Sequence, residues 1–144
     1  MKMSQAEWQV MRVLWAYPNI RSTEVVSRLE EDFDWKPATV KTLLNRLKGK
    51  GLIQMEKLEG KFYYRAEVSE EWQWEEEWRA FLGNICQTNH GKVLLSVIES
   101  VSLSVRDLEV LKGLLDDKLI SAPNQVACAC PKGQCACHHV CERK

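Results

Sequence analysis

The sequence has few of the side chains that enzymes most often use for proton transfer. Its 144 residues include only three histidines, His90, His138 and His139. None of them belongs to a recognisable set of a nucleophile with its base. Cysteines are more numerous, but four thiolates that close a tetrahedral metal site leave no open position for metal catalysis. The composition therefore favours a protein that is not an enzyme.

Long apolar runs are also missing. No uninterrupted run approaches the roughly twenty residues of a membrane-spanning helix. The start of the sequence has no apolar stretch of the signal-peptide type, and Glu7 follows almost at once. We therefore expect a cytoplasmic protein with no membrane partner. In that compartment, clustered cysteines bind metals more often than they form disulfides.

The chain has no net charge, because 20 Lys and Arg balance 20 Asp and Glu. The balance conceals an asymmetry. Residues 36–65 carry eight Lys and Arg against two Glu, a net charge of +6, whereas residues 69–144 carry eight against eleven acidic residues, or −3. A local basic stripe on a neutral protein indicates a phosphate-backbone partner. A solvated helix face is the alternative explanation.

Cysteines, in contrast, are concentrated near the C-terminal end. Two Cys-x-Cys pairs flank residues 131–134, which include a proline and a glycine. Side chains two apart in an extended segment share a face, so a turn between the pairs brings four thiolates together. Such soft ligands select zinc, copper(I) or iron–sulfur centres. We predict a metal site here, with disulfides or a redox pair as the alternative, and the ligands are Cys128, Cys130, Cys135 and Cys137.

The two other cysteines stand apart from this quartet. Cys86 ends an apolar helical pattern, which favours a buried thiol. Cys141, His138 and His139 are spare candidate ligands, but the four paired cysteines fill a tetrahedral site without them.

Three helices are predicted at the start of the chain. Ser4 and Glu7 form a capping box that begins the first helix, and Pro18 ends it. The second helix begins at Ser22. Pro37 lies in the first turn of the third helix, a position where proline is tolerated.

Beyond the third helix, the apolar period changes from helical toward two. Residues 52–58 and 61–68 each predict a strand, and Glu59-Gly60 between them is a turn signal. Three helices followed by a hairpin is the element order of a winged helix-turn-helix. The hairpin tip, with Lys61 beside it, would be the wing.

Three more helices are predicted within residues 69–121, with Gly91 separating the first from the second and Ser104 capping the third. Their apolar stripes are broad, and a unit this small buries its core poorly alone. We therefore expect a homodimer; packing of the stripes on the N-terminal domain is the alternative. The predicted fold is mainly α with a small β-hairpin, in three parts: a winged helix-turn-helix DNA-binding domain (1–68), a helical dimerisation region (69–121) and a metal-binding tail (122–144).

The third helix has the surface of a DNA-recognition helix. Its apolar residues, from Val40 to Leu47, recur on one face and leave polar residues outside. Arginine can pair with guanine, asparagine with adenine and threonine with the thymine methyl group, while lysines neutralise phosphates. An ordinary amphipathic helix is the alternative, but the basic hairpin that follows favours DNA binding. The outward residues are Thr39, Lys41, Thr42, Asn45, Arg46 and Lys48.

Residues 35–53, WKPATVKTLLNRLKGKGLI, with Ser4-Gln-Ala-Glu7-Trp8 before them, resemble the penicillinase-repressor family of winged-helix repressors. The Cys128-x-Cys130-x4-Cys135-x-Cys137 tail is similar to that of the copper-responsive branch, the CopY repressors. The resemblance covers nearly the whole chain. It implies a homodimeric repressor of copper-export genes on a palindromic double-stranded DNA operator. It also implies Zn(II) in the DNA-bound state and release when Cu(I) replaces zinc.

The resemblance also implies roles for particular residues. Lys36 departs from the family pattern, because relatives often have a serine-like cap there and a lysine cannot accept amide hydrogens. A copper chaperone is a further candidate partner. A copper(I) or zinc storage protein of the metallothionein kind is the alternative function, but it leaves the basic helix and hairpin without a role. The implied DNA contacts are Thr39, Lys41, Thr42, Asn45, Arg46 and Lys61 at the wing, and the implied metal ligands are Cys128, Cys130, Cys135 and Cys137.

Overall fold

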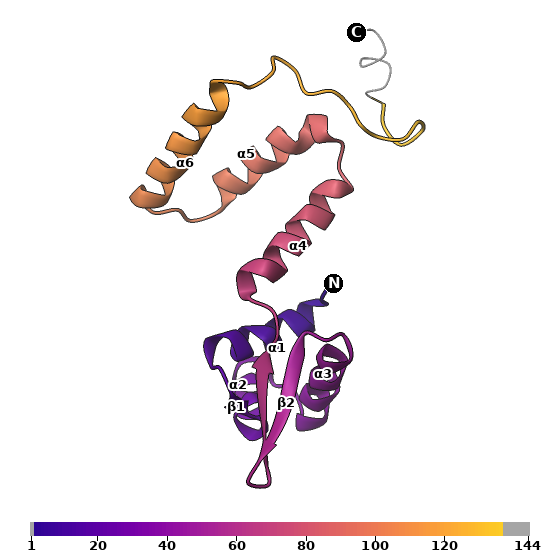
Figure 1. The fold of residues 1–144 in the computed structure, drawn as a ribbon, viewed down its shortest axis with the longest axis vertical. Helices are drawn as coiled ribbons and strands as arrows, with labels where there is room; N and C mark the ends of the chain where they lie inside the picture. Colours follow the sequence, from indigo (N-terminus) through magenta and orange to yellow (C-terminus); the bar gives the residue numbers. More distant parts are fainter. Residues whose placement is uncertain (1, 137–144) are drawn as a thin grey trace. The chain divides into compact units, whose positions relative to one another are not determined.

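The computed structural model describes residues 2–136 (Figure 1). Met1 and residues 137–144 lie outside the described residues. The chain divides into two compact units, Met1–Trp78 and Arg79–Lys144.

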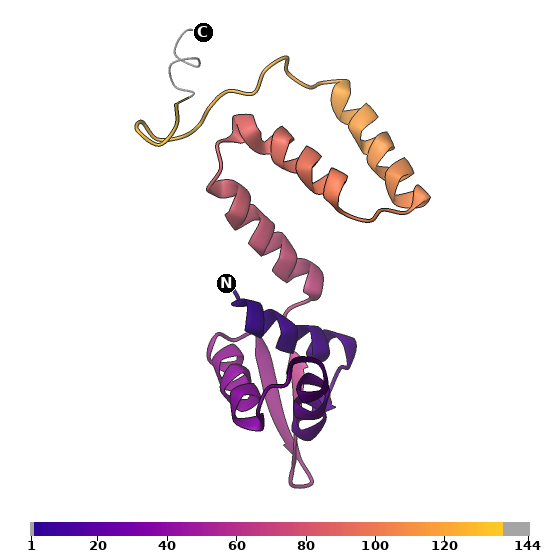
Figure 2. The same ribbon diagram turned by 180° about the vertical axis from the view of Figure 1, so that it is seen from behind.

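The first unit contains three helices and a small sheet, in the order that the sequence predicts. Its first helix begins at the predicted capping box, because the Ser4 hydroxyl accepts from the Glu7 amide at 3.1 Å and the Glu7 carboxylate accepts from the Ser4 amide at 3.1 Å. The helices lie on one face of the sheet: the hairpin is nearer the viewer in Figure 1, and α2 and α3 are nearer in Figure 2. The elements are α1 (Gln5–Ala16), α2 (Ser22–Phe33), α3 (Pro37–Gly49), β2 (Ile53–Leu58) and β3 (Lys61–Ala66).

A third strand, β1 (Ile20–Arg21), completes the sheet and was not predicted. The strand order is β1-β3-β2, and both pairings are antiparallel. Ile20 pairs with Tyr64, and Arg21 pairs with Tyr63. A two-residue strand is too short to show a period of two. Its pairing with β3 attaches the segment between α1 and α2 to the hairpin.

The predicted turn of the hairpin is confirmed. Glu59 and Gly60 have φ values of 52° and 78°, and two successive positive φ angles are typical of the type I′ turn that matches strand twist. The pair Leu58 and Lys61 closes the hairpin on either side of this turn. Strand β3 is shorter than the predicted strand of residues 61–68, since it ends at Ala66.

The core of the first unit lies between the helices and the sheet. Helix α3 contributes four buried side chains, Val40, Leu43, Leu44 and Leu47, as its apolar period predicts. Each side chain of this kind stabilises the fold by roughly 1.5–3 kcal/mol when it is fully buried. The rotation of α3 about its axis is therefore fixed by its core face. The segments that pack around this face supply Val10, Met11, Leu14, Val25, Leu29, Leu52 and Ile53.

Helix α4 (Glu70–Gly83) begins in the first unit and ends in the second. The second unit also holds η1 (Gln87–Asn89), α5 (His90–Ser100) and α6 (Val105–Leu119). The prediction that Gly91 separates two helices is wrong, because Gly91 lies in the first turn of α5 and the break is at residues 84–89. A glycine is tolerated near a helix end, so its presence did not mark a boundary.

The Ser104 cap is confirmed. Its hydroxyl accepts from the Asp107 amide at 3.0 Å, and the Asp107 carboxylate accepts from the Ser104 amide at 3.1 Å. Neither α5 nor α6 has a buried residue, although both carry apolar stripes. Within residues 2–136, no helix combines the length and the apolar character that crossing a membrane requires.

The Glu7–Lys50 pair joins α1 to the C-terminal end of α3. The side chain of Glu7 is only 3% exposed. The Lys50 ammonium donates a hydrogen bond to Glu7 Oε1 at 2.9 Å. The same ammonium lies 2.9 Å from Glu7 Oε2, which is an ionic contact outside hydrogen-bond geometry. Burial raises the pKa of Glu7, but hydrogen bonds from Lys50 and Ser4 outweigh it, so the net pKa is lowered. The pair therefore stabilises the fold above the unfolded pKa of Glu7 and loses that contribution as the pH falls through the folded pKa.

We predict that Glu7→Gln lowers the free energy of unfolding by about 1–3 kcal/mol at neutral pH, because it leaves Lys50 without its partner charge. The loss should shrink in acid, where wild-type Glu7 also becomes neutral. Urea unfolding at both pH values measures it. Glu56→Gln, at an exposed position, is the matched control and should change little. A loss that is equal at both pH values would contradict the role of the pair.

Candidate nucleic-acid interface and metal centre

The outward face of α3 has the composition that the sequence predicts. Lys36 is the N-cap of α3 and makes no side-chain capping bond, and Pro37 is the first helical residue. The helix therefore begins at Pro37 without a side-chain cap. The Lys36 side chain is exposed and does not cap the helix. The six residues that the resemblance assigns to DNA are all exposed: Thr39, Lys41, Thr42, Asn45, Arg46 and Lys61.

Thr42 differs from its neighbours on this face because its hydroxyl already has a partner. Its Oγ1 donates to the Ala38 carbonyl at 2.9 Å. The hydroxyl proton is therefore engaged within the helix, a common arrangement for threonine in a helix interior. Thr42 retains its methyl group and its oxygen lone pairs for an outside partner.

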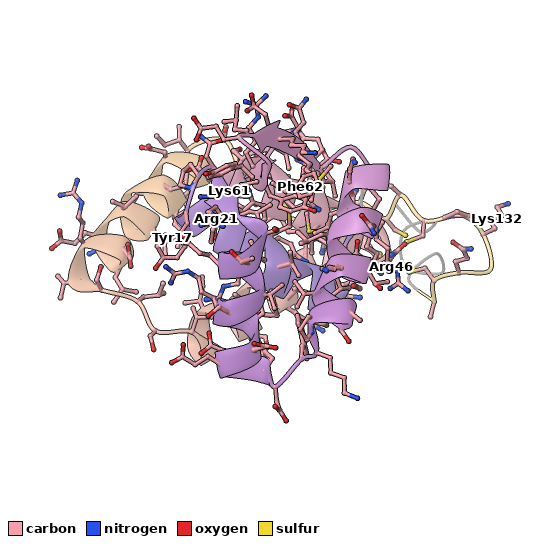
Figure 3. All side chains as sticks on the ribbon, turned by 90° about the horizontal axis from the view of Figure 1, so that it is seen from below. Tyr17, Arg21, Arg46, Lys61, Phe62 and Lys132 are labelled. Carbon is pink, nitrogen blue, oxygen red and sulfur yellow. The ribbon has the colours of Figure 1, made fainter. Side chains whose placement is uncertain are left out.

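Two of the basic residues in the stripe of residues 36–65 have partners within the protein. Lys50 pairs with the buried Glu7, and Arg65 donates to Gln54 and lies 3.5 Å from Glu67. These two charges are partly balanced inside the protein. Arg21 was missed by sequence reasoning, because only the pairing of β1 with β3 brings it beside the hairpin. Figure 3, which views the protein from below, labels Arg21, Arg46 and Lys61 on the first unit.

Four cysteines of the second unit form a cluster. Their sulfur atoms all lie within 4.8 Å of one another, and the residues are Cys86, Cys128, Cys130 and Cys135. Cys135 is disulfide-bonded in this structure, whereas Cys86, Cys128 and Cys130 form no disulfide. The Cys86 and Cys128 sulfurs are 3.6 Å apart. Three of these residues were predicted as ligands, whereas Cys137, the fourth predicted ligand, lies outside the described residues.

The interpretation of Cys86 as a buried core thiol is wrong. The residue is only half-buried, lies beyond the end of α4 and contacts the tail. Nothing in its sequence neighbourhood indicates this position, because Cys86 and Cys128 are 42 residues apart. Only the path of the chain through α5 and α6 reveals the contact.

The segment that carries Cys86 is held by its own hydrogen bonds. The His90 Nε2 lies 2.9 Å from both the Leu82 and the Ile85 carbonyl oxygens, so this nitrogen carries a proton and donates. The side-chain amide of Gln87 donates to the Ala127 carbonyl. This bond joins the segment that carries Cys86 to the start of the tail. A cavity of about 540 Å³ lies against this segment, and its lining includes Cys86, His90, Cys130 and Gln134.

The thiols of the cluster differ in acidity. The Thr88 hydroxyl lies 3.0 Å from Cys86 Sγ, and hydrogen bonds from this hydroxyl and from the Thr88 backbone lower the pKa of Cys86 to about 7. The hydrogen bond to Cys86 raises the pKa of Cys130 to about 11, because Cys130 would have to give up a shared proton. One thiolate therefore forms near neutral pH, and a second one beside it is unfavourable unless a cation compensates.

With the disulfide of Cys135 reduced, the donor set and its spacing fit a tetrahedral thiolate site. Zinc–sulfur bonds of roughly 2.3 Å place neighbouring sulfurs about 3.8 Å apart in a tetrahedron. The Cys86 and Cys128 sulfurs are 3.6 Å apart, and the whole cluster lies within 4.8 Å. Four convergent sulfurs also suit copper(I), which prefers soft ligands.

Comparison with known proteins defines the class. The sequence profile of the penicillinase repressor family matches residues 3–117, so the chain belongs to the penicillinase repressor family. It is therefore a transcriptional repressor of this family.

Among its relatives is an uncharacterised 16.5 kDa protein of Latilactobacillus sakei from the ptsI 3′ region, 33% identical over 94% of this chain and 93% of that protein. The methicillin resistance regulatory protein MecI of Mammaliicoccus sciuri is 27% identical over 81% of this chain and 95% of that protein. The solved structure of monomeric BlaI from Bacillus licheniformis, in complex with the blaP half-operator, is 34% identical, with a TM-score of 0.46, over 49% of this chain and 87% of that chain.

Proposed function

We propose that the protein is a copper-responsive repressor that binds operator DNA as a zinc-loaded homodimer and is released when copper(I) replaces the zinc. The observation that carries this proposal is the combination, in one repressor chain, of an exposed polar face on α3 with a cluster of four cysteines. The DNA face supplies the repressor activity. The cluster supplies the response to a soft metal ion.

DNA recognition would use α3 in the major groove and the hairpin as the wing. The core face of α3 is buried, so Asn45 and Arg46 must face outward. Their side chains can make bidentate contacts to adenine and guanine, respectively. Lys61, at the start of β3, suits a phosphate contact, which positions the protein without reading sequence.

A second copy of the chain would cover the apolar stripes of α5 and α6. Leu95 is 59% exposed and Leu119 is 73% exposed, and isolated helices of this length are marginal in water. An isologous dimer buries both stripes at once and presents two α3 helices to a palindromic operator.

We predict that Leu115→Glu, on the α6 stripe, yields monomers or misfolded protein and abolishes tight binding to an operator with two half-sites. A charge placed in an apolar interface lacks a partner there, which strongly opposes association. Sedimentation measures the assembly and a gel shift measures the binding. Lys118→Glu, an exposed charged position on the same helix, is the control. Wild-type monomers at micromolar concentration would contradict the dimer.

The response to copper must come from geometry rather than charge. Two copper(I) ions carry the same total charge as one zinc ion, so if copper enters as such a pair, exchange at four thiolates leaves the formal charge of the site unchanged. In that case, electrostatic repulsion of DNA cannot release the protein. Zinc favours a closed tetrahedral arrangement, whereas copper(I) accepts fewer sulfurs and bridging. The thiolates would then take different positions in the two states, and these positions would set the spacing of the two α3 helices.

A copper(I) or zinc storage protein remains the competing function. The thiol cluster suits it equally well, but storage gives no role to the exposed face of α3 or to the family membership. A salt-sensitive gel shift on duplex DNA separates the two functions, because storage requires no such binding.

We predict that Arg46→Ala or Asn45→Ala weakens specific operator binding by roughly 1–3 kcal/mol, through loss of a bidentate base contact. Lys61→Ala should weaken specific and non-specific DNA alike and reduce the salt slope, since a phosphate contact carries no sequence information. Fluorescence anisotropy at several salt concentrations measures both effects. Intact affinity in both the Arg46 and the Asn45 variants would show that α3 does not recognise DNA.

We predict that copper(I) releases zinc from the loaded protein and, in parallel, releases the operator. Copper(I) is softer than zinc and should displace it from a site made only of sulfur. Replacing Cys128 and Cys130 with serine should remove the response without unfolding the first unit, which contains neither residue. A zinc-release assay and a gel shift follow the two events. DNA affinity that ignores both metals would contradict the sensor function.

A further inference from the structure

We propose that Cys86 is a ligand of the regulatory metal ion, so that the metal fastens the tail to the connection between α4 and α5. The inference rests on the proposed function and names a residue that lies outside the two Cys-x-Cys pairs. It makes the site a joint product of two segments far apart in the sequence.

The contacts of Cys86 carry this inference. Its sulfur lies 3.6 Å from the Cys128 sulfur, close to the spacing of neighbouring ligands in a tetrahedral site. All four sulfurs of the cluster lie within 4.8 Å of one another, so one ion can reach each of them. The Cys130 amide also donates to the Cys128 sulfur at 3.4 Å, which orients that sulfur within the cluster.

The segment that carries Cys86 provides a firm support for a ligand. The His90 imidazole donates to the Leu82 and Ile85 carbonyls, so the turn between α4 and α5 is held in place. The Gln87 side chain reaches the Ala127 carbonyl, one residue before Cys128. This second contact brings the tail to the turn independently of any sulfur. Cys86 is therefore presented to the tail by two separate sets of hydrogen bonds.

The consequence follows from the path of the chain. Residues 87–127 lie between Cys86 and Cys128, and this stretch contains both α5 and α6. A metal bound by Cys86 and the tail closes a loop around these helices and removes conformational freedom from their unfolded state. A metal bound only by the tail closes a short loop within residues 128–137 and leaves α5 and α6 unconstrained. The two ligand sets thus predict different effects on the helices.

The experiment compares Cys86→Ser with Cys137→Ser in the full-length protein loaded with Co(II), a spectroscopic substitute for zinc. If Cys86 is a ligand, Cys86→Ser loses about a quarter of the thiolate-to-cobalt charge-transfer absorbance, since one of four sulfurs is gone. Zinc should slow hydrogen exchange of the α5 and α6 amides in the wild type and in Cys137→Ser, but not in Cys86→Ser. Circular dichroism of the metal-free variants checks that each is folded.

An unchanged cobalt spectrum in Cys86→Ser, or zinc protection of α5 and α6 that persists in it, overturns the inference. Should that variant fail to fold, alkylation of the wild type decides instead: bound zinc should slow iodoacetamide modification of Cys86 by about tenfold or more. An unchanged rate in zinc-loaded protein overturns the inference. Failure of the wild type to bind Zn(II), Co(II) or copper(I) would overturn the proposed function itself, which is a separate result.

Discussion

The burial of one face of α3 is the constraint on which the DNA-binding unit depends. Helix α3 contributes four side chains to a single core, Val40, Leu43, Leu44 and Leu47. Rotating the helix to expose any of them would cost more free energy than a new contact at the surface would supply. The outward face is therefore fixed before any DNA arrives. Trp15 adds to this rigidity, because its indole donates to the Val68 carbonyl at 2.9 Å and ties α1 to the chain after β3. If this face recognises DNA, as proposed, it needs little ordering when it binds.

The second unit presents the opposite situation. Its helices α5 and α6 have no buried residue in the single chain, so their positions depend on groups beyond their own packing. Under the proposed function, a partner chain and a bound metal are the two candidates, and both would constrain α5 and α6. Elements of low intrinsic stability are the ones that respond most readily to a ligand. A well-packed first unit and a second unit whose helices lack buried residues would suit the proposed function, in which one surface stays constant while the assembly changes.

Periodicity in the sequence was sufficient for the elements that bury a regular face. The capping boxes at Ser4 and Ser104, the apolar face of α3 and the Glu59-Gly60 turn are all local signals, and the structure confirms each of them. The sequence could not reveal β1, because two residues carry no period and their partners on β3 are 44 and 42 residues away. The role of Lys50 was hidden for a related reason. From the sequence alone Lys50 belongs to the basic stripe, whereas in the fold its charge pairs with Glu7.

The cysteine cluster shows most clearly what local sequence patterns cannot predict. Spacing within the tail correctly groups Cys128, Cys130 and Cys135, because a short segment determines its own geometry. Spacing says nothing about Cys86, whose approach depends on how α5 and α6 return the chain to the end of α4. Under the proposed function, a ligand of this kind would have a physical consequence. Ligands confined to the tail would report metal exchange only to the tail, whereas a ligand on the turn after α4 would transmit a change in coordination geometry to a helix that begins in the first unit.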